Sequence, residues 1–195
     1  MESSNENKDD HRPRAFSGHK TGDQGVNTHR LREGRAMKGK IISVNISDNK
    51  GEKKHNIGGC RLVEGHGLHD DAHAGPWHRQ VSLLAVESIK KIKDMGLDVK
   101  PGDFAENLTT EGIDLPTLPI GTTLQINGNI VMKVTQIGKE CHSRCAIFYQ
   151  VGDCVMPKEG IFTEVVVGGD IKVGDEIEVL LGGGTKVGDE IEVLL

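Results

Sequence analysis

Alternating apolar and polar positions predict that the chain folds mainly into short β-strands. Residues 37–46 carry Ile42, Val44 and Ile46 at every second position, which is the pattern of a strand with one buried face. Residues 80–84 form a short apolar run, as expected of a buried strand. We therefore expect the ordered domain to begin at Met37.

Four further strands are predicted in the second half of the chain. Segments 124–126 and 130–134 flank an Asn-Gly-Asn turn, which is a strong β-hairpin signal. Residues 161–167 are rich in β-branched side chains, and residues 172–180 alternate after a predicted Gly-Gly-Asp turn. These strands extend the β pattern almost to the end of the chain.

One amphipathic helix is predicted over residues 86–95. Apolar side chains from Val86 to Met95 recur at helical spacing, and Gly96 stands where a glycine commonly ends a helix. Short strands at this spacing predict a mainly β fold, a closed or nearly closed barrel with one or two short helices.

The two ends of the chain differ from this pattern. Residues 1–36 are rich in charge and almost free of large apolar side chains, which predicts a disordered extension. Residues 172–181 recur without change as residues 186–195, and we interpret this repeat as a recent duplication or a cloning scar. Either copy could supply the last strand. We place the first copy in a domain spanning 37–181 and predict that 182–195 form a tail.

Composition narrows the possible functions. The chain has 195 residues and a formal net charge of -5, which gives no general electrostatic reason to bind nucleic acid or an anionic membrane. No apolar run approaches the roughly 20 residues that span a bilayer, and the N-terminus lacks a secretory pattern. We therefore expect a cytoplasmic protein whose four cysteines are thiols rather than disulfides.

Cys145 is the strongest candidate for chemistry. Arg144 adjoins it, and His142 and Lys139 lie close in sequence, so that cations favour its thiolate form. The alternative is a buried structural cysteine, which is the common case for a free thiol. Of the other cysteines, Cys154 is expected to be packed and Cys60 to lie in a loop without a role.

Residues 66–78 hold four histidines and two aspartates, which suggests a second kind of site. These side chains are suitable ligands for zinc or iron, although their spacing matches no standard helical metal motif. The alternative is a polar loop whose histidines bond to the backbone. Arg79 follows this loop and is expected to pair with an acid or bind an anion such as phosphate. Asn107 is expected either to bind a ligand or to cap a turn.

Taken in order, three segments resemble the MOSC domain, the C-terminal module of molybdenum cofactor sulfurase. Residues 71–84 read Asp-Ala-His-Ala-Gly-Pro-Trp-His-Arg-Gln-Val-Ser-Leu-Leu. Residues 102–114 read Gly-Asp-Phe-Ala-Glu-Asn-Leu-Thr-Thr-Glu-Gly-Ile-Asp, and residues 138–145 read Gly-Lys-Glu-Cys-His-Ser-Arg-Cys. The likeness covers about residues 37–181 and is greatest to the stand-alone bacterial form.

The resemblance implies a barrel-like β fold that binds molybdenum cofactor or carries sulfur destined for it. Cys145 would be the reactive thiol and the metal ligand. The pterin and its phosphate would be contacted by Arg79, Asn107, Ser143 and Arg144, and we predict His78 as a further cofactor-binding residue. Implied partners are proteins of cofactor biosynthesis, molybdoenzymes, and a sulfur donor similar to cysteine desulfurase.

A second function is implied by relatives in which the matching cysteine ligates molybdenum and N-hydroxylated compounds are reduced. Such an enzyme would need separate electron-transfer partners. Those reductases have an arginine where this chain has Ala105 and carry an additional N-terminal barrel, and the cofactor sulfurases carry a pyridoxal-phosphate domain. A zinc or iron protein using the histidine-rich loop is the third hypothesis. A soft thiolate suits both a molybdenum centre and sulfur transfer, so the residues leave these roles open.

Overall fold

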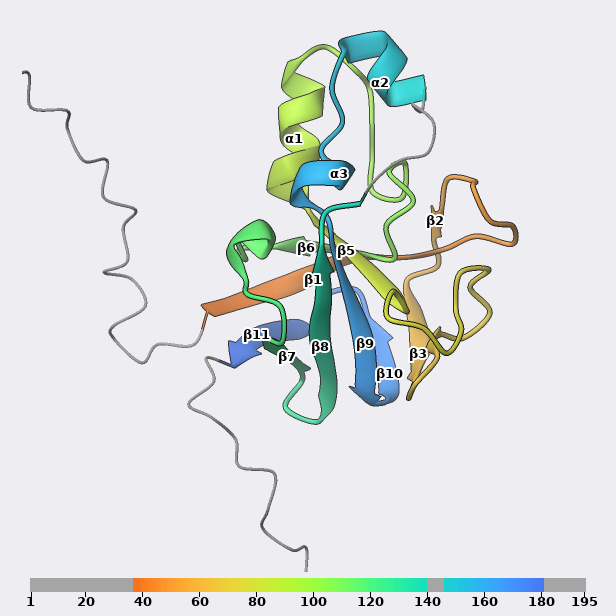
Figure 1. Ribbon diagram of the computed structural model, residues 1–195, viewed down its shortest axis with the longest axis vertical. Helices are drawn as coiled ribbons and strands as arrows, with labels where there is room; N and C mark the ends of the chain where they lie inside the picture. Colours follow the sequence, from red (N-terminus) through yellow and green to blue (C-terminus); the bar gives the residue numbers. More distant parts are fainter. Residues whose placement is uncertain (1–36, 140–145, 181–195) are drawn as a thin grey trace, which may run out of the picture. The chain divides into compact units, whose positions relative to one another are not determined.

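Seven strands close into a barrel in the computed structural model, which describes residues 37–139 and 146–180. The order around the barrel is β11-β7-β8-β9-β5-β6-β1, and β1 pairs with β11 to complete the ring (Figure 1). This confirms the predicted mainly β, barrel-like fold. The predicted tails, 1–36 and 182–195, lie outside the described residues. The barrel strands are β1 (Met37–Ile46), β5 (Val81–Ala85), β6 (Leu108–Glu111), β7 (Thr123–Ile126), β8 (Ile130–Ile137), β9 (Ile161–Val167) and β11 (Glu176–Leu180).

The long first strand makes closure possible, because β1 pairs with three different neighbours along its length. Residues 37–40 pair with β11, residues 40–44 pair with β6, and residues 45–46 pair with the short β2 (His55–Asn56). A register irregularity between Ile41 and Ser43 accompanies the pairing with β6. Such irregularities bend a strand, and bending is what a closed barrel requires.

A second sheet of three strands corrects two sequence predictions. It contains β3 (Gly59–Val63), β4 (Gly67–Leu68) and β10 (Gly169–Lys172) in the order β10-β3-β4. Cys60 therefore lies in a strand and not in a loop. The predicted Gly-Gly-Asp turn is also wrong, because two of its residues belong to β10. Pairing with β3 gives this glycine-containing segment hydrogen-bond partners that local sequence does not reveal.

The predicted strand 172–180 is divided by a turn. Lys172 ends β10, and β11 begins only at Glu176. The Asp175 carboxylate accepts a hydrogen bond of 2.8 Å from the Lys172 amide, and Gly174 adopts a φ of +95°. Glycine suits that left-handed conformation because it has no Cβ. The first copy of the repeat thus supplies the closing strand.

The predicted helix over 86–95 is confirmed as α1 (Val86–Asp94). It ends before Gly96, which adopts a φ of +94°. The described residues also form α2 (Ala146–Val151), α3 (Met156–Glu159) and a 3-10 turn, η2 (Leu115–Thr117). The sequence predicted one or two short helices, whereas the described part of the chain holds three. Figure 1 shows α1, α2 and α3 gathered at one end of the barrel. None of the helices in the described ranges is long and apolar enough to cross a bilayer.

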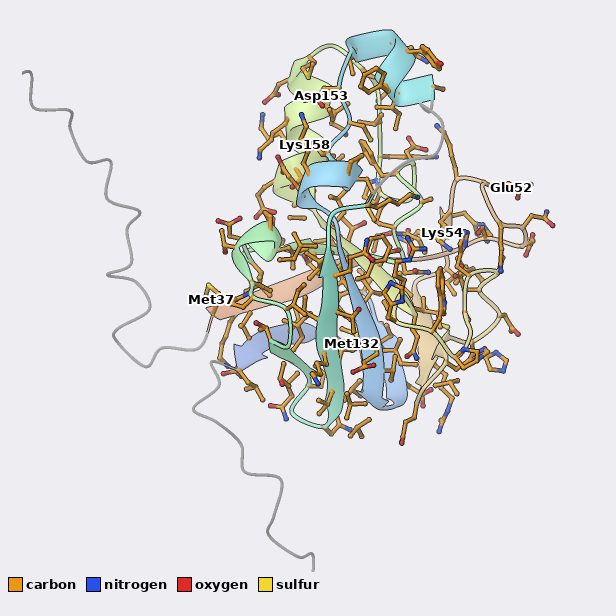
Figure 2. The ribbon with its side chains drawn as sticks, viewed as in Figure 1. Met37, Glu52, Lys54, Met132, Asp153 and Lys158 are labelled. Atoms are coloured by element: carbon orange, nitrogen blue, oxygen red, sulfur yellow. The ribbon has the colours of Figure 1, made fainter. Side chains whose placement is uncertain are left out.

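Two apolar clusters meet at β5. Leu83 belongs to the barrel interior, and its sequence neighbour Leu84 packs with α1 and α3 on the outer face. Both side chains are 0 % exposed, which explains why this strand is a continuous apolar run. Met132 on β8 is another fully buried member of the barrel interior (Figure 2).

Candidate functional site

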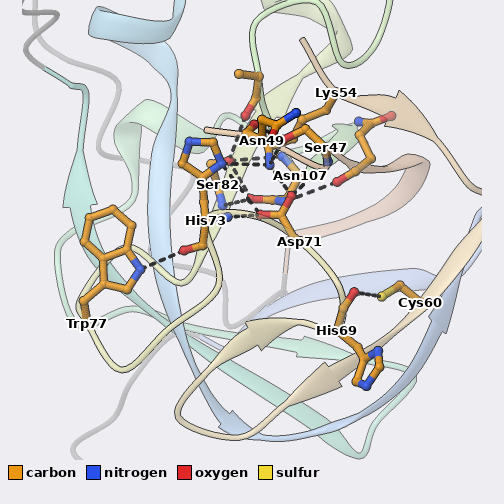
Figure 3. Close-up of polar contacts among 12 residues, drawn as sticks. Ser47, Asn49, Lys54, Cys60, His69, Asp71, His73, Trp77, Ser82 and Asn107 are labelled. Atoms are coloured by element: carbon orange, nitrogen blue, oxygen red, sulfur yellow. Dashed lines mark hydrogen bonds and ion pairs between the residues drawn. The ribbon is translucent and has the colours of Figure 1, made fainter. Parts of the chain in front are cut away.

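The Asp71 carboxylate is the centre of a buried polar network. One of its oxygens accepts hydrogen bonds from the Lys54 ammonium group and, at 3.1 Å, from the Ser47 amide (Figure 3). The other oxygen accepts a hydrogen bond of 3.1 Å from the His73 amide. The side chains of Lys54 and Asp71 are 1 % and 0 % exposed. This network ties Asp71 and His73 of the histidine-rich loop to Ser47, the residue after β1.

Burial and pairing act in opposite directions on this ion pair. Burial by itself would raise the pKa of Asp71, but the hydrogen bond and the charge of Lys54 outweigh it and hold the pKa of Asp71 below its usual value. Burial lowers the pKa of Lys54, and the hydrogen bond and charge of Asp71 oppose that change. Removing one partner of such a pair is strongly destabilising, because it leaves the other charge buried without compensation.

His73 lies against the same ion pair. Its Nδ1 is 3.3 Å from the Lys54 Nζ, and since an ammonium group can only donate, Nδ1 is the acceptor. Burial and then the charge of Lys54 lower the pKa of His73, so that the imidazole is neutral at pH 7. The His73 carbonyl accepts a hydrogen bond of 3.0 Å from the Trp77 indole, which orders the rest of the loop.

Arg79 is held between two aromatic rings. Its guanidinium carbon lies 4.7 Å from the ring centroid of Trp77 and 5.6 Å from that of Phe162 on β9. Both distances are suitable for cation–π attraction. Among the described residues Arg79 makes no ion pair, and its buried Nε has no hydrogen-bond partner. An arginine that is fixed in place and lacks an acid is prepared to bind an external anion.

A bulge in β8 places the loop against the strand that leads into residues 140–145. The register between β8 and β9 shifts between Val134 and Gln136, which leaves Thr135 unpaired. The Thr135 hydroxyl donates to the His78 carbonyl. The Gln136 amide oxygen lies 3.1 Å from His78 Nε2, and its nitrogen donates to the Gly138 carbonyl at 2.7 Å. His78 Nε2 is therefore the protonated ring nitrogen, because the amide oxygen can only accept.

The chain leaves β8 through a tightly constrained glycine. Gly138 has a φ of +68°, and a Cβ at this position would lie 2.3 Å from the Pro157 carbonyl oxygen. Only glycine fits such a close approach. Lys139 follows it. Burial is the main cause of the lowered pKa of Lys54 and of His73, and the Lys139 charge adds to the lowering of both. Lys139 makes no ion pair with any described residue, so neither Arg79 nor Lys139 has an acidic partner within residues 37–139 and 146–180.

The side chain of Asn107 is hydrogen-bonded within the protein. Its side-chain oxygen accepts hydrogen bonds from the Ser82 amide at 3.1 Å and from the Ser82 hydroxyl at 2.9 Å. Its amide nitrogen donates to the Asn45 carbonyl at 3.2 Å. After Lys54, the Asn107 side chain also helps to hold the pKa of Asp71 below its usual value. These bonds join β1, β5 and β6 at the end of the barrel beneath the ion pair.

Glu106 is a fully buried acid beside Asn107. Its Oε1 accepts hydrogen bonds from the Gly102 amide at 2.6 Å and from the Thr109 hydroxyl at 2.8 Å. Its Oε2 has no partner among the described residues. Burial raises the pKa of Glu106 above its usual value, and the two hydrogen bonds offset only part of that rise.

The structure brings some of the predicted site residues together. His78 and Arg79 lie beside the exit from β8, while Asn107 contributes to the network around Asp71. Cys145, Ser143 and Arg144 lie outside the described residues. The histidines of the loop do not converge: His66 and His69 are exposed, and His73 and His78 bond to different groups. Figure 3 shows His69 well apart from His73. No group of three or more metal-ligating side chains forms within 37–139 and 146–180.

Sequence reasoning missed the residues that organise this site. Lys54 stands in a charged run, where only its burial distinguishes it from Lys53, which is 65 % exposed. The roles of Thr135 and Gln136 depend on a bulge that has no local signal. Trp77 did have a local sequence signal, because a single tryptophan two positions before an arginine is a candidate for cation–π packing.

Comparison with known proteins agrees with this architecture. The sequence model of the MOSC domain matches residues 70–178. The fold is similar to that of YuaD from Bacillus subtilis, with a TM-score of 0.63 and 20 % identity over 74 % of this chain and 97 % of YuaD. It is also similar to YiiM from Geobacillus stearothermophilus, with a TM-score of 0.55 and 18 % identity over 73 % and 75 % of the two chains. No curated protein sequence matches the chain.

We predict that Asp71→Asn destabilises the protein by about 3–5 kcal/mol, because it leaves the buried Lys54 charge without a counter-charge. The free energy of unfolding in urea measures this. Asp170→Asn is the matched control, since Asp170 is exposed and 3.7 Å from Arg61, and it should cost about 0–1 kcal/mol. Lys54→Met in the Asp71→Asn background should recover part of the loss. A double variant no more stable than Asp71→Asn would contradict the pairing.

Glu106→Gln tests the buried acid. A folded-state pKa raised above the usual 4.5 gives a stabilising contribution that is complete below pH 4.5 and is lost as the pH rises through the folded-state pKa. Glutamine has no such contribution. The free energy of unfolding of the variant minus that of the wild type should therefore increase as the pH rises above 4.5. A difference independent of pH would disprove the raised pKa.

Proposed function

Because this chain belongs to the MOSC domain family, we propose that it binds molybdenum cofactor at the edge where β8 leads into residues 140–145. Cys145 would supply a soft thiolate ligand to the metal. The observation that carries this proposal is the Arg79 guanidinium, which is fixed between Trp77 and Phe162 and has no acidic partner among the described residues.

The buried Nε of Arg79, which has no hydrogen-bond partner among the described residues, suits the phosphate group of the cofactor. A phosphate group can accept both from this nitrogen and from the outer guanidinium nitrogens, which removes the cost of an unsatisfied buried donor. Lys139 adds a second cation that has no acidic partner among the described residues. Two such cations attract an anionic group and also favour the thiolate form of a nearby cysteine. When bound, the cofactor would supply a redox-active molybdenum held by sulfur.

The surrounding residues position these groups. The Asp71 network fixes the beginning of the 71–79 loop, and Thr135 and Gln136 hold His78 against β8 at its other end. His78 keeps its Nδ1 available to accept a hydrogen bond from a ligand. Asn107 supports this arrangement by bonding to Ser82 and Asn45. Position 105 presents only a methyl group, so the phosphate would depend on Arg79 and Lys139.

Two finer roles stay predictions. As a sulfur carrier, Cys145 would hold a persulfide received from a donor similar to cysteine desulfurase and pass it to the cofactor or a molybdoenzyme. As a reductase of N-hydroxylated compounds, the loaded protein would need electrons from a separate protein. Both roles require the same thiolate and the same anion-binding edge.

The proposal predicts which substitutions remove bound metal. Full-length protein is mixed with molybdenum cofactor without oxygen, separated by size, and assayed for molybdenum. Wild type and Cys60→Ala should retain the metal, since Cys60 lies in β3 of the small sheet. Cys145→Ala should lose it. Equal retention by Cys145→Ala would refute the ligand assignment.

Arg79→Ala should weaken cofactor binding by roughly ten- to a hundredfold, as expected when one charge-assisted hydrogen bond is lost. Arg61→Ala is the matched control, because Arg61 is exposed and lies in the other sheet. Unchanged affinity in Arg79→Ala would show that the phosphate binds elsewhere.

A further inference from the structure

The strand that closes the barrel has a second copy in the same chain. Residues 172–181 and 186–195 have the same sequence, Lys-Val-Gly-Asp-Glu-Ile-Glu-Val-Leu-Leu, and are separated by Gly-Gly-Gly-Thr. In the structure the first copy forms the end of β10, the turn and β11. The slot that β11 fills lies between β1 and β7.

The slot selects its strand by an alternating pattern. Ile177 and Val179 are 0 % exposed and pack into the barrel core. On the opposite face, Glu176 and Glu178 lie 2.6 Å and 3.5 Å from the Lys38 ammonium group. Val179 stands between Met37 of β1 and Leu124 of β7, so that its side chain is surrounded by the two neighbouring strands.

The turn before the strand is specified just as closely. The Asp175 carbonyl accepts a hydrogen bond of 2.9 Å from the Ile41 amide, and the Gly174 amide donates to the Ile41 carbonyl at 2.8 Å. Gly174 needs its positive φ, and the Asp175 carboxylate bonds to the Lys172 amide. The slot thus recognises a Lys-x-Gly-Asp turn followed by alternating apolar residues.

Every group that the slot recognises recurs fourteen positions later (186 − 172 = 14). Ile191 and Val193 repeat the two core side chains, and Gly188 and Asp189 repeat the turn. Because the side chains and spacing are identical, the strand contacts would have the same free energy whichever copy makes them. The two arrangements then differ mainly in chain entropy, since the second requires residues 172–185 to form a loop.

We propose that the slot between β1 and β7 is a binding site for this ten-residue sequence, and that the copy at 186–195 binds there in place of the first copy of the same chain. Closing a fourteen-residue loop disfavours the exchanged state by on the order of fiftyfold, from the logarithmic dependence of loop entropy on length. The second copy is therefore a spare closing strand. It takes over when the first copy is damaged or withdrawn.

The test places a charge in each copy of the full-length chain. Val179→Asp puts a carboxylate at a fully buried position, which a single available strand could not tolerate. The proposal predicts that Val179→Asp remains a folded monomer with a cooperative but lower thermal transition, because 186–195 fills the slot. Val193→Asp should behave as wild type. Val179→Asp combined with Val193→Asp should lose the cooperative transition.

Hydrogen exchange identifies the strand in use. The substitution gives the two copies different masses, so their peptides can be followed separately. In Val179→Asp the amides of 186–195 should be protected and those of 172–181 should exchange freely, with the reverse in Val193→Asp. Val166→Asp is the matched control at a position that is 43 % exposed on β9, and it should leave the wild-type pattern unchanged.

Two results would overturn the proposal. A Val179→Asp variant that is as unfolded as the double variant would show that the second copy cannot enter the slot. A folded Val179→Asp that is a concentration-dependent dimer would show that the second copy binds a neighbouring molecule and not its own chain. These outcomes are independent of cofactor binding, so they do not bear on the proposed function.

Discussion

The buried ion pair between Lys54 and Asp71 is the contact on which the candidate site depends. Lys54 precedes β2, whereas Asp71 opens the loop that ends in Arg79, so the pair joins two segments that share no strand pairing. Asp71 also receives the Ser47 and His73 amides. A buried carboxylate with this many donors stays ionised and holds its surroundings in one arrangement. The position of the loop follows from that arrangement.

The barrel provides the other fixed side of the site. The bulge in β8 turns Thr135 and Gln136 towards the loop, and Gly138 then directs the chain past Pro157. Bulges often lie beside functional sites because they re-aim side chains without ending the strand. Arg79 stands between these two constraints. Its rings come from the loop itself and from Phe162 on β9, so both sides of the site hold the same cation.

Local sequence predicted the elements whose pattern is local. The alternation in β1, the spacing in α1 and the Asn-Gly turn between β7 and β8 each depend on neighbouring residues, and each was found. The small sheet was missed because β3 and β10 are short, contain glycine and lack alternation, so that only their mutual pairing makes them strands. Division of the 172–180 segment was missed because its turn depends on contacts outside the alternating pattern. The Lys172 amide donates to the Asp175 carboxylate, and the backbone of Gly174 and Asp175 bonds to Ile41 of β1.

Local sequence predicted even less of the site than of the fold. The motifs indicated Arg79, His78 and Asn107. They gave no sign that Lys54 is buried while Lys53 is exposed, or that Glu106 is fully buried. Burial of a charge depends on which distant segments cover it. The segment 71–79 could be singled out from its own residues, whereas the groups that hold it in place are scattered along the chain. Ser47 follows β1, Lys54 precedes β2, and Thr135 lies in β8.

The most direct test of the account is the identity of the atoms bound to molybdenum in the loaded protein. X-ray absorption at the molybdenum edge detects the atoms bound to the metal. If the Cys145 sulfur is replaced by selenium, a selenium atom next to molybdenum can come only from residue 145. The account predicts a molybdenum–selenium contact in protein that retains the metal. Bound molybdenum without a selenium neighbour would contradict it.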